Sequence, residues 1–179
     1  NLDVYLASEE AVQVDQINAN RRVELRINGN LTNAGSVPSS INGHSIQLES
    51  GLFGIGTDVT PVTVTTQSGG SLQFAAGTSA CVTSPTADVA LVLGFAEDVL
   101  RLNAGGAITD FFGGTADRVF GNDITLSGAS IGANDQTLGL RQRTTAGSTN
   151  LTSTLGDIQV AASQGGLNLS GFNSAAGGR

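Results

Sequence analysis

Short alternating segments separated by glycine and asparagine corners constrain this chain more than any other feature. The stretch from Gly43 to Val64 shows the pattern most clearly. Ile46 and Leu48 alternate with polar residues, a glycine-rich corner follows, and a second alternating segment begins after Pro61. Side chains at every second position of a strand share one face, so this alternation predicts strands with one buried face. We therefore expect a chain that runs straight, turns and runs straight again.

The spacing of equivalent apolar positions predicts how these strands are connected. A β-sandwich built from hairpins would need many tight Asn-Gly turns between long strands, and only Asn28-Gly29 and Asn42-Gly43 qualify. A recurrence near twenty residues is instead within the period of solenoids, and predicts a stack of roughly eight irregular coils. The leucine pairs that define this spacing are Leu25 and Leu48, Leu72 and Leu91, Leu102 and Leu126, and Leu151 and Leu169.

The pattern of short alternating segments is interrupted at about residues 87–123. Residues 87–102 are denser in apolar side chains and fit either two strands around a turn at Glu97-Asp98 or a partly helical segment. Two strands are favoured, because Gly94 would weaken a helix. Phe111, Phe112 and Phe120 lie close together in the sequence after it. They mark either the widest part of the core or an aromatic patch that faces a partner.

Composition excludes several classes of protein. Hydrophobic residues make up 39% of the chain, which supports a core, but aromatic residues are 4% and tryptophan is absent, so that core must be aliphatic. A net charge of −7 argues against nucleic-acid binding, which needs a basic surface. No apolar stretch approaches the roughly 20 residues of a membrane-spanning helix. Cys81 has no second cysteine to pair with, and its small and apolar neighbours predict a buried thiol rather than a reactive one.

Three segments carry a resemblance to a known family. They are residues 17–25, residues 41–64 with Gly54-Ile55-Gly56-Thr57 before Pro61-Val62, and, more faintly, residues 151–169. This order resembles the repeats of the filamentous-haemagglutinin-like adhesins, which are very large secreted bacterial exoproteins. The resemblance implies a right-handed parallel β-helix that serves as a long rod or an adhesive surface.

No arrangement of residues predicts catalysis, a metal or a cofactor. His44 is the only histidine and lies on a corner between Gly43 and Ser45, without the Gly-x-Ser-x-Gly turn of a serine hydrolase. The carboxylate pairs Glu9-Glu10 and Glu97-Asp98 are adjacent in sequence, and adjacent residues of a strand face opposite sides. A glycine- and aspartate-rich segment at residues 113–123 occurs once, and one copy cannot build a stacked calcium site.

We therefore expect a single all-β domain over residues 1–179, a right-handed parallel β-helix, with a pilin-like β-sandwich as the alternative. The expected role is a structural or adhesive segment of a secreted or cell-surface bacterial protein. It would form homo-oligomers or filaments, continue as part of a larger chain, or bind a host surface or glycan. The alternatives are a pilus-like subunit that donates its first strand, and a β-helical carbohydrate-active enzyme. Edge pairing would use Leu2, Val4, Leu6, Leu167 and Leu169.

Overall fold

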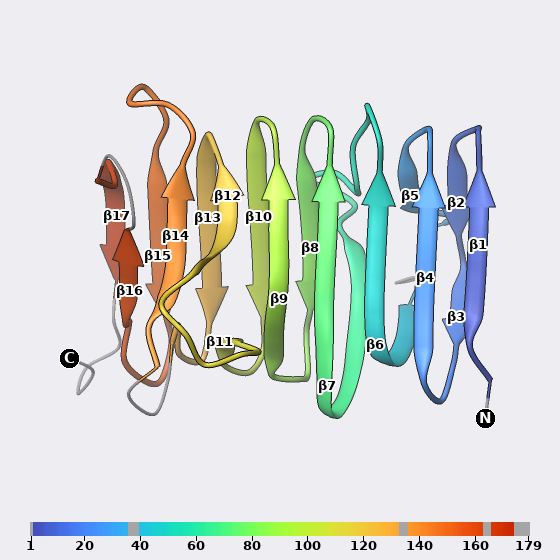
Figure 1. Ribbon diagram of the computed structural model, residues 1–179, viewed down its shortest axis with the longest axis horizontal. Coiled ribbons are helices and arrows are strands. Elements are labelled where there is room, and N and C mark those ends of the chain that lie inside the picture. The colour runs from blue at the N-terminus through green and yellow to red at the C-terminus, as the bar shows by residue number, and fades with distance from the viewer. Residues whose placement is uncertain (1, 36–39, 133–135, 163–165, 174–179) are drawn as a thin grey trace.

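The protein is an all-β solenoid of about seven turns, a right-handed parallel β-helix without any helical segment among the described residues. The structure is a computed structural model that describes residues 2–35, 40–132, 136–162 and 166–173. Its strands lie side by side along the long axis, and the first and last strands of the chain are at opposite ends of the rod (Figure 1). All strand pairs among these residues are parallel. The β-sandwich alternative was wrong, because its hairpins would give antiparallel pairs.

One face of the rod, the first sheet, is a ladder of parallel strands that come from successive turns. Its order is β1, β4, β6, β7, β9, β12, β14 and β16. The bounds are β1 Val4–Ser8, β4 Arg22–Ile27, β6 Ser40–Ser50, β7 Val62–Ala76, β9 Val89–Ala96, β12 Asp117–Gly121, β14 Leu138–Gln142 and β16 Val160–Ala162.

The second sheet lies behind the first. A bridge at Ile55 joins the pair β2 and β5 to β8, and the ladder then continues through β10, β13, β15 and β17. The bounds are β2 Val12–Val14, β5 Leu31–Asn33, β8 Ala80–Ser84, β10 Val99–Ala104, β13 Asp123–Gly128, β15 Thr149–Ser153 and β17 Leu169–Asn173. A shorter third side contains β3, Gln16–Asn18, and β11, Ile108–Asp110.

Apolar residues from successive turns stack in columns between these sheets. Leu25, Leu48 and Phe74 occupy consecutive positions of one column and are fully buried. Each turn supplies few inward side chains, so aliphatic residues fill the interior, as the composition predicted. Stacked identical positions also explain the sequence spacing, because each column places one apolar residue in every turn.

The structure confirms three of the four leucine pairs that defined the spacing. Leu25 pairs with Leu48, Leu72 with Leu91, and Leu102 with Leu126. The fourth pair was wrong, because Leu169 lies beside Thr149, and after a register shift in β17 Phe172 lies beside Leu151.

The dense middle of the chain follows the favoured prediction of two strands. β9 ends at Ala96 and β10 begins at Val99, with the turn at Glu97-Asp98 between them. Residues 31–40 are largely polar and carry no clear strand pattern in the sequence, yet Leu31–Asn33 forms β5 and Leu31 is fully buried. Residues 36–39 of that segment lie outside the described part of the chain.

Candidate functional site

The two ends of the rod are the first candidate surface, because their inward-facing residues lose the burial seen elsewhere in the same columns. Leu6 is 40% exposed, although it shares its column with the fully buried Leu25. At the other end, Leu169 is 50% exposed beside the buried Thr149. Leu2 is 69% exposed. Val4 and Leu167 are half-buried and pack against the core.

The backbone at both ends is also unpaired on one side. Within the described residues β1 pairs only with β4, and β17 pairs only with β15. An edge strand exposes a row of N–H and C=O groups that another parallel strand can pair with. The five residues predicted as assembly edges therefore lie in two groups, one in the first turn and one in the last.

The loop between β11 and β12 carries two of the three predicted aromatic residues. Phe111 is 44% and Phe112 is 63% exposed, and their rings meet edge to face with centroids 5.1 Å apart. Residues 111–116 leave the ladder here, because Asp110 still pairs with Leu91 while the next paired residue is Asp117, opposite Gly139. The first turn of the loop therefore presents an aromatic pair to solvent.

Asp110 fixes the shape of this loop. It is buried, and its carboxylate accepts hydrogen bonds from the backbone N–H groups of Phe112 at 2.8 Å and Gly114 at 3.2 Å. The guanidinium of Arg118 donates from Nε to the same carboxylate at 2.9 Å and lies over the Phe112 ring at 4.7 Å. Buried carboxylates need such partners. The loop is therefore held in place by one side chain.

Phe120 does not join this pair. It lies on the outer face of β12 in register with Phe95, and the two ring centroids are 6.4 Å apart. Arg143 covers Phe95 at 5.5 Å and forms an ion pair with Glu97. The predicted patch is thus divided into an exposed pair in the loop and a half-buried residue of the first sheet.

A hollow on the second sheet, lined by both polar and apolar residues, was not predicted from the sequence. The loop of residues 57–61 folds over β8, where the carboxylate of Asp58 forms an ion pair with Arg101 and accepts a hydrogen bond from the Cys81 thiol at 3.2 Å. The hollow has a volume of about 270 Å³ and is lined by Asp58, Cys81, Thr83, Arg101, Asn103 and Ser127, among others. Asp58 and Arg101 are 43 residues apart, and no local pattern connects them.

Cys81 is buried, as its neighbours in the sequence predicted. It faces the hollow and lies outside the aliphatic core cluster. Burial raises the pKa of its thiol to about 12, and the hydrogen bond to Asp58 and the charge of that carboxylate act in the same direction. The thiolate is the nucleophilic form of cysteine, so this residue is chemically quiet near neutral pH.

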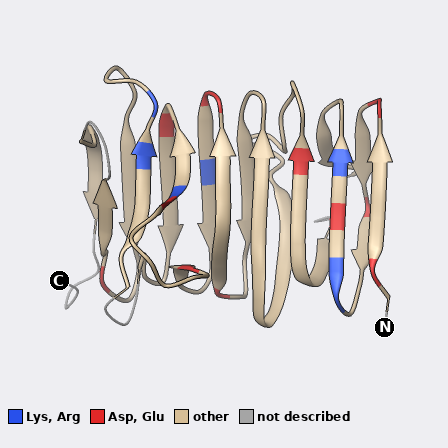
Figure 2. Ribbon diagram, viewed as in Figure 1, with Lys and Arg blue, Asp and Glu red and all other residues tan. Residues whose placement is uncertain are grey.

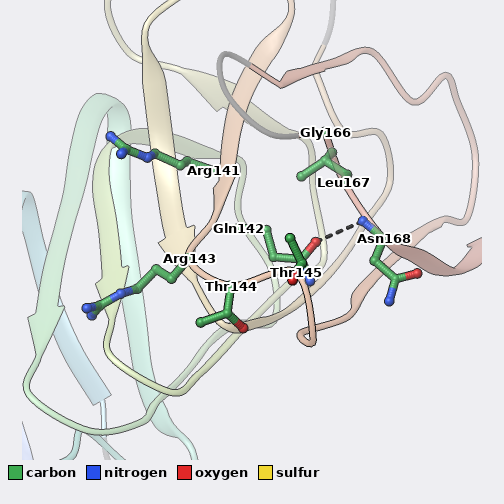
Figure 3. A pocket seen from close by; sticks show the side chains of 8 residues that line it. All are labelled: Arg141, Gln142, Arg143, Thr144, Thr145, Gly166, Leu167 and Asn168. Atoms are coloured by element: carbon green, nitrogen blue, oxygen red, sulfur yellow. Dashed lines mark hydrogen bonds between the residues drawn. The ribbon is translucent and has the colours of Figure 1, made fainter.

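A second depression, of about 510 Å³, lies at the end of β14. Arg141 and Arg143 extend to the same side of it, and the side chain of Gln142 accepts a hydrogen bond from the backbone N–H of Asn168 (Figure 3). The guanidinium of Arg143 is occupied by Glu97. Residues 163–165, next to the lining residue Gly166, lie outside the described part of the chain, and we build no proposal on this depression.

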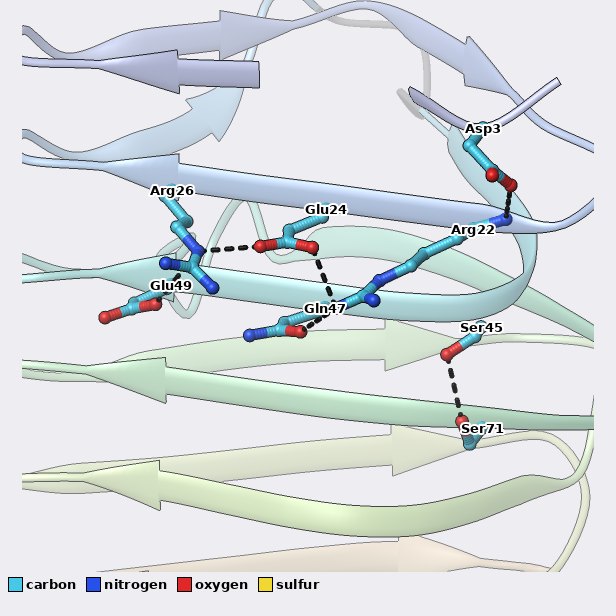
Figure 4. Close-up of polar contacts among 8 residues, drawn as sticks. All are labelled: Asp3, Arg22, Glu24, Arg26, Ser45, Gln47, Glu49 and Ser71. Carbon is cyan, nitrogen blue, oxygen red and sulfur yellow. Dashed lines mark hydrogen bonds and ion pairs between the residues drawn. The ribbon is translucent and has the colours of Figure 1, made fainter. Parts of the chain in front are cut away.

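The basic residues of the first turns belong to a lattice of ion pairs on the outer face of β4 and β6. Glu24 contacts Arg22 and Arg26, both at 2.7 Å (Figure 4). Arg22 also donates to the amide oxygen of Gln47 at 2.8 Å. Ion pairs at a protein surface contribute about 0–1 kcal/mol each, so the lattice adds little to stability.

The titratable side chains considered for catalysis lie in different parts of the rod and have different partners. His44 is exposed at the bend of β6, where the register shifts. Glu9 accepts a hydrogen bond from Asn28, and Glu97 pairs with Arg143. Among the described residues, no three His, Cys, Asp or Glu side chains are grouped closely enough to hold a metal ion. In the same part of the chain no helix has the length and hydrophobicity needed to span a membrane.

Comparison of the chain with protein-family models, with curated proteins and with solved structures found no match.

Proposed function

We propose that this chain is a structural segment of a secreted or cell-surface bacterial protein, a rigid β-rod that displays loops and stacks end to end. The setting follows from the resemblance of residues 17–25 and 41–64 to adhesin repeats. The rod itself follows from the stacked ladders. The adhesive part would be contributed by what the rod displays, including the ordered loop that carries Phe111 and Phe112.

One observation carries the stacking proposal. Positions that are fully buried in the middle turns are 40–54% exposed where the same columns reach the ends, at Leu6, Leu169 and Phe172. Burying apolar surface is worth about 25 cal/mol for each Å², and pairing the free backbone edges adds hydrogen bonds. A further parallel turn supplies both, and a second copy of this chain has such turns at its own ends.

Charge favours stacking of the first turn of one copy on the last turn of another. Residues 2–20 contain four acidic residues, Asp3, Glu9, Glu10 and Asp15, and no basic residue. Residues 158–173 contain no charged residue. Two first turns in contact would bring two acidic groups together, whereas a first turn on a last turn would not. The ribbon of Figure 2 is red at the acidic residues of the first strands, near the N-terminal end. Head-to-tail contact also preserves the parallel ladder, and such contacts generate filaments when they do not close into rings.

The test is negative-stain electron microscopy with analytical ultracentrifugation over a concentration series. We expect rods that lengthen as concentration rises. Leu6→Asp and Leu169→Asp should each stop this growth, because either change places a charge in the contact. Leu52→Asp is the matched control, since Leu52 is 80% exposed in a corner loop and should stack like the wild type. Single particles at every concentration, or growth unaffected by both end variants, would refute end-to-end stacking.

A further inference from the structure

We propose that the outer face of the second sheet binds a neutral polysaccharide, with the Asp58–Arg101 hollow holding one sugar ring. This inference does not depend on end-to-end stacking. It rests on the hollow itself, on a column of uncharged polar residues that leads away from it, and on the electrical neutrality of the surface.

The polar column is made of one residue from each successive strand of the sheet. Register places these residues directly beside one another, from β8 through β10, β13 and β15 to β17. They alternate with inward-facing core residues such as Leu102 and Leu126, so their side chains point outward. The column consists of Thr83, Asn103, Ser127, Thr152 and Asn173.

The hydrogen-bonding groups of this column are free. Within the described residues, no side-chain hydrogen bond or ion pair is found for Asn103, Ser127 or Thr152. Each carries both a donor and an acceptor, as a sugar hydroxyl does. Neighbouring strands of a sheet lie about 4.8 Å apart, so the column repeats at a fixed interval along the rod. A linear chain of sugar units presents hydroxyl groups at a comparably regular interval.

The hollow has a defined shape, because hydrogen bonds hold the loop that covers it. Thr57 and Thr60 close the covering loop through a hydroxyl contact at 2.8 Å and a bond from the Thr60 N–H at 3.0 Å. The carboxylate of Asp58 and the guanidinium of Arg101 are planar groups held against each other, with Asn103 beside them in the lining. A volume of about 270 Å³ is slightly below that of sites for drug-sized ligands, which occupy about 300–1,000 Å³, and it suits a single sugar ring.

Charge selects a neutral ligand over an acidic one. The two charges of the hollow neutralise each other, and Asp123, the only acidic residue of β13, accepts hydrogen bonds from the N–H and hydroxyl of Ser148. β8 and β15 carry no charged residue and are tan in Figure 2. The whole chain has a net charge of −7, which repels polyanions. A neutral polysaccharide, which carries hydroxyl groups and no charge, is not repelled in this way.

Affinity at one site should be modest. No aromatic side chain lines the hollow, so stacking on a sugar face is absent and hydrogen bonds must carry recognition. We expect dissociation constants of about 1 mM for an oligosaccharide. A rod with several copies would bind a polymer more tightly through multiple contacts.

The test is a titration of the complete chain followed by ¹⁵N–¹H NMR. The probes are neutral hexasaccharides of glucose, N-acetylglucosamine, mannose and galactose, with an acidic hexagalacturonate for comparison. We expect at least one neutral hexasaccharide to shift the amide signals of β8, β10 and β13, and the acidic one to shift none of them. Asn103→Ala and Ser127→Ala should each weaken binding about tenfold, by the loss of hydrogen bonds.

Gln73→Ala is the matched control, because Gln73 lies at an outward position of the first sheet and should not affect binding. Circular dichroism on every sample establishes that the solenoid is intact. No response to any neutral hexasaccharide, shifts confined to the first sheet, or a response to the acidic probe alone would overturn the proposal. Such a result with intact rods that still stack would leave the proposed structural role untouched.

Discussion

Leu6 and Leu25 occupy the same position on adjacent turns, but Leu6 is 40% exposed and Leu25 is fully buried. The difference comes from position along the rod, since the two side chains are identical. Leu25 has turns on both sides, whereas Leu6 has a described turn on one side only.

This pair gives a direct stability comparison. Leu25→Ala should lower the free energy of unfolding by about 2–5 kcal/mol, because it opens a cavity between two turns. Leu6→Ala should cost less than about 1 kcal/mol in the unstacked protein, since much of that side chain already contacts water. Chemical denaturation at low protein concentration measures both values. Equal losses of unfolding free energy in the two variants would show that the first turn is covered in solution.

Gly56 should be intolerant of a side chain. Its φ is +63°, and a Cβ placed there would lie 2.4 Å from the carbonyl oxygen of Cys81. We expect Gly56→Ala to destabilise the protein by about 1–3 kcal/mol and to displace the loop that carries Asp58. Gly35→Ala is the control, because no atom lies within 4 Å of a Cβ at that position. Thermal unfolding of the two variants separates a local clash from a general effect of alanine.

Asp110 should control the order of the aromatic loop. Asp110→Asn replaces one acceptor oxygen by a donor and removes the charge that faces Arg118, so we expect faster amide exchange at residues 111–116. The expected loss of stability is about 1–3 kcal/mol. Hydrogen exchange followed by mass spectrometry reports both quantities. Asp98→Asn, at an exposed turn residue, should leave exchange in the loop unchanged.

The thiol of Cys81 should make stability fall at alkaline pH. Burial raises its pKa from 9.0 to about 12 in the folded protein, so between these values the unfolded chain loses the thiol proton first. The contribution of the Cys81 thiol to the free energy of unfolding is therefore fully present below about pH 9. It decreases toward pH 12, by at most about 1.4 kcal/mol for each pH unit.

The measurement compares the wild type with Cys81→Ala by urea denaturation between pH 7 and pH 10.5. The difference in unfolding free energy should be constant up to about pH 9 and then shift in favour of the variant. Alkylation of the folded wild type by iodoacetamide at pH 8 should be slow compared with that of the urea-unfolded chain. Rapid alkylation of the folded protein would contradict a buried, protonated thiol.

The sequence alone determined the class of fold, because each turn of a β-helix repeats the same local requirement. Alternation in Val23, Leu25 and Ile27 shows which face is buried, and the spacing of Leu25 and Leu48 gives the pitch. The local pattern failed in the last turn, because Leu169 pairs with Thr149 and the register shift that follows places Phe172 beside Leu151.

Only the tertiary structure decided what the outer surfaces carry. Stacking of turns brings Asp58 to Arg101 and aligns Asn103 with Ser127, and these partners are separated in sequence by one or more whole turns. Outward residues obey no hydrophobic pattern, so the sequence holds no local signal of which of them meet. Burial by neighbouring turns likewise distinguishes Leu6 from Leu25, although both fit the same alternation. The core residues could therefore be predicted from the periodicity of the sequence. The candidate sites could be identified only once the register between the turns was known.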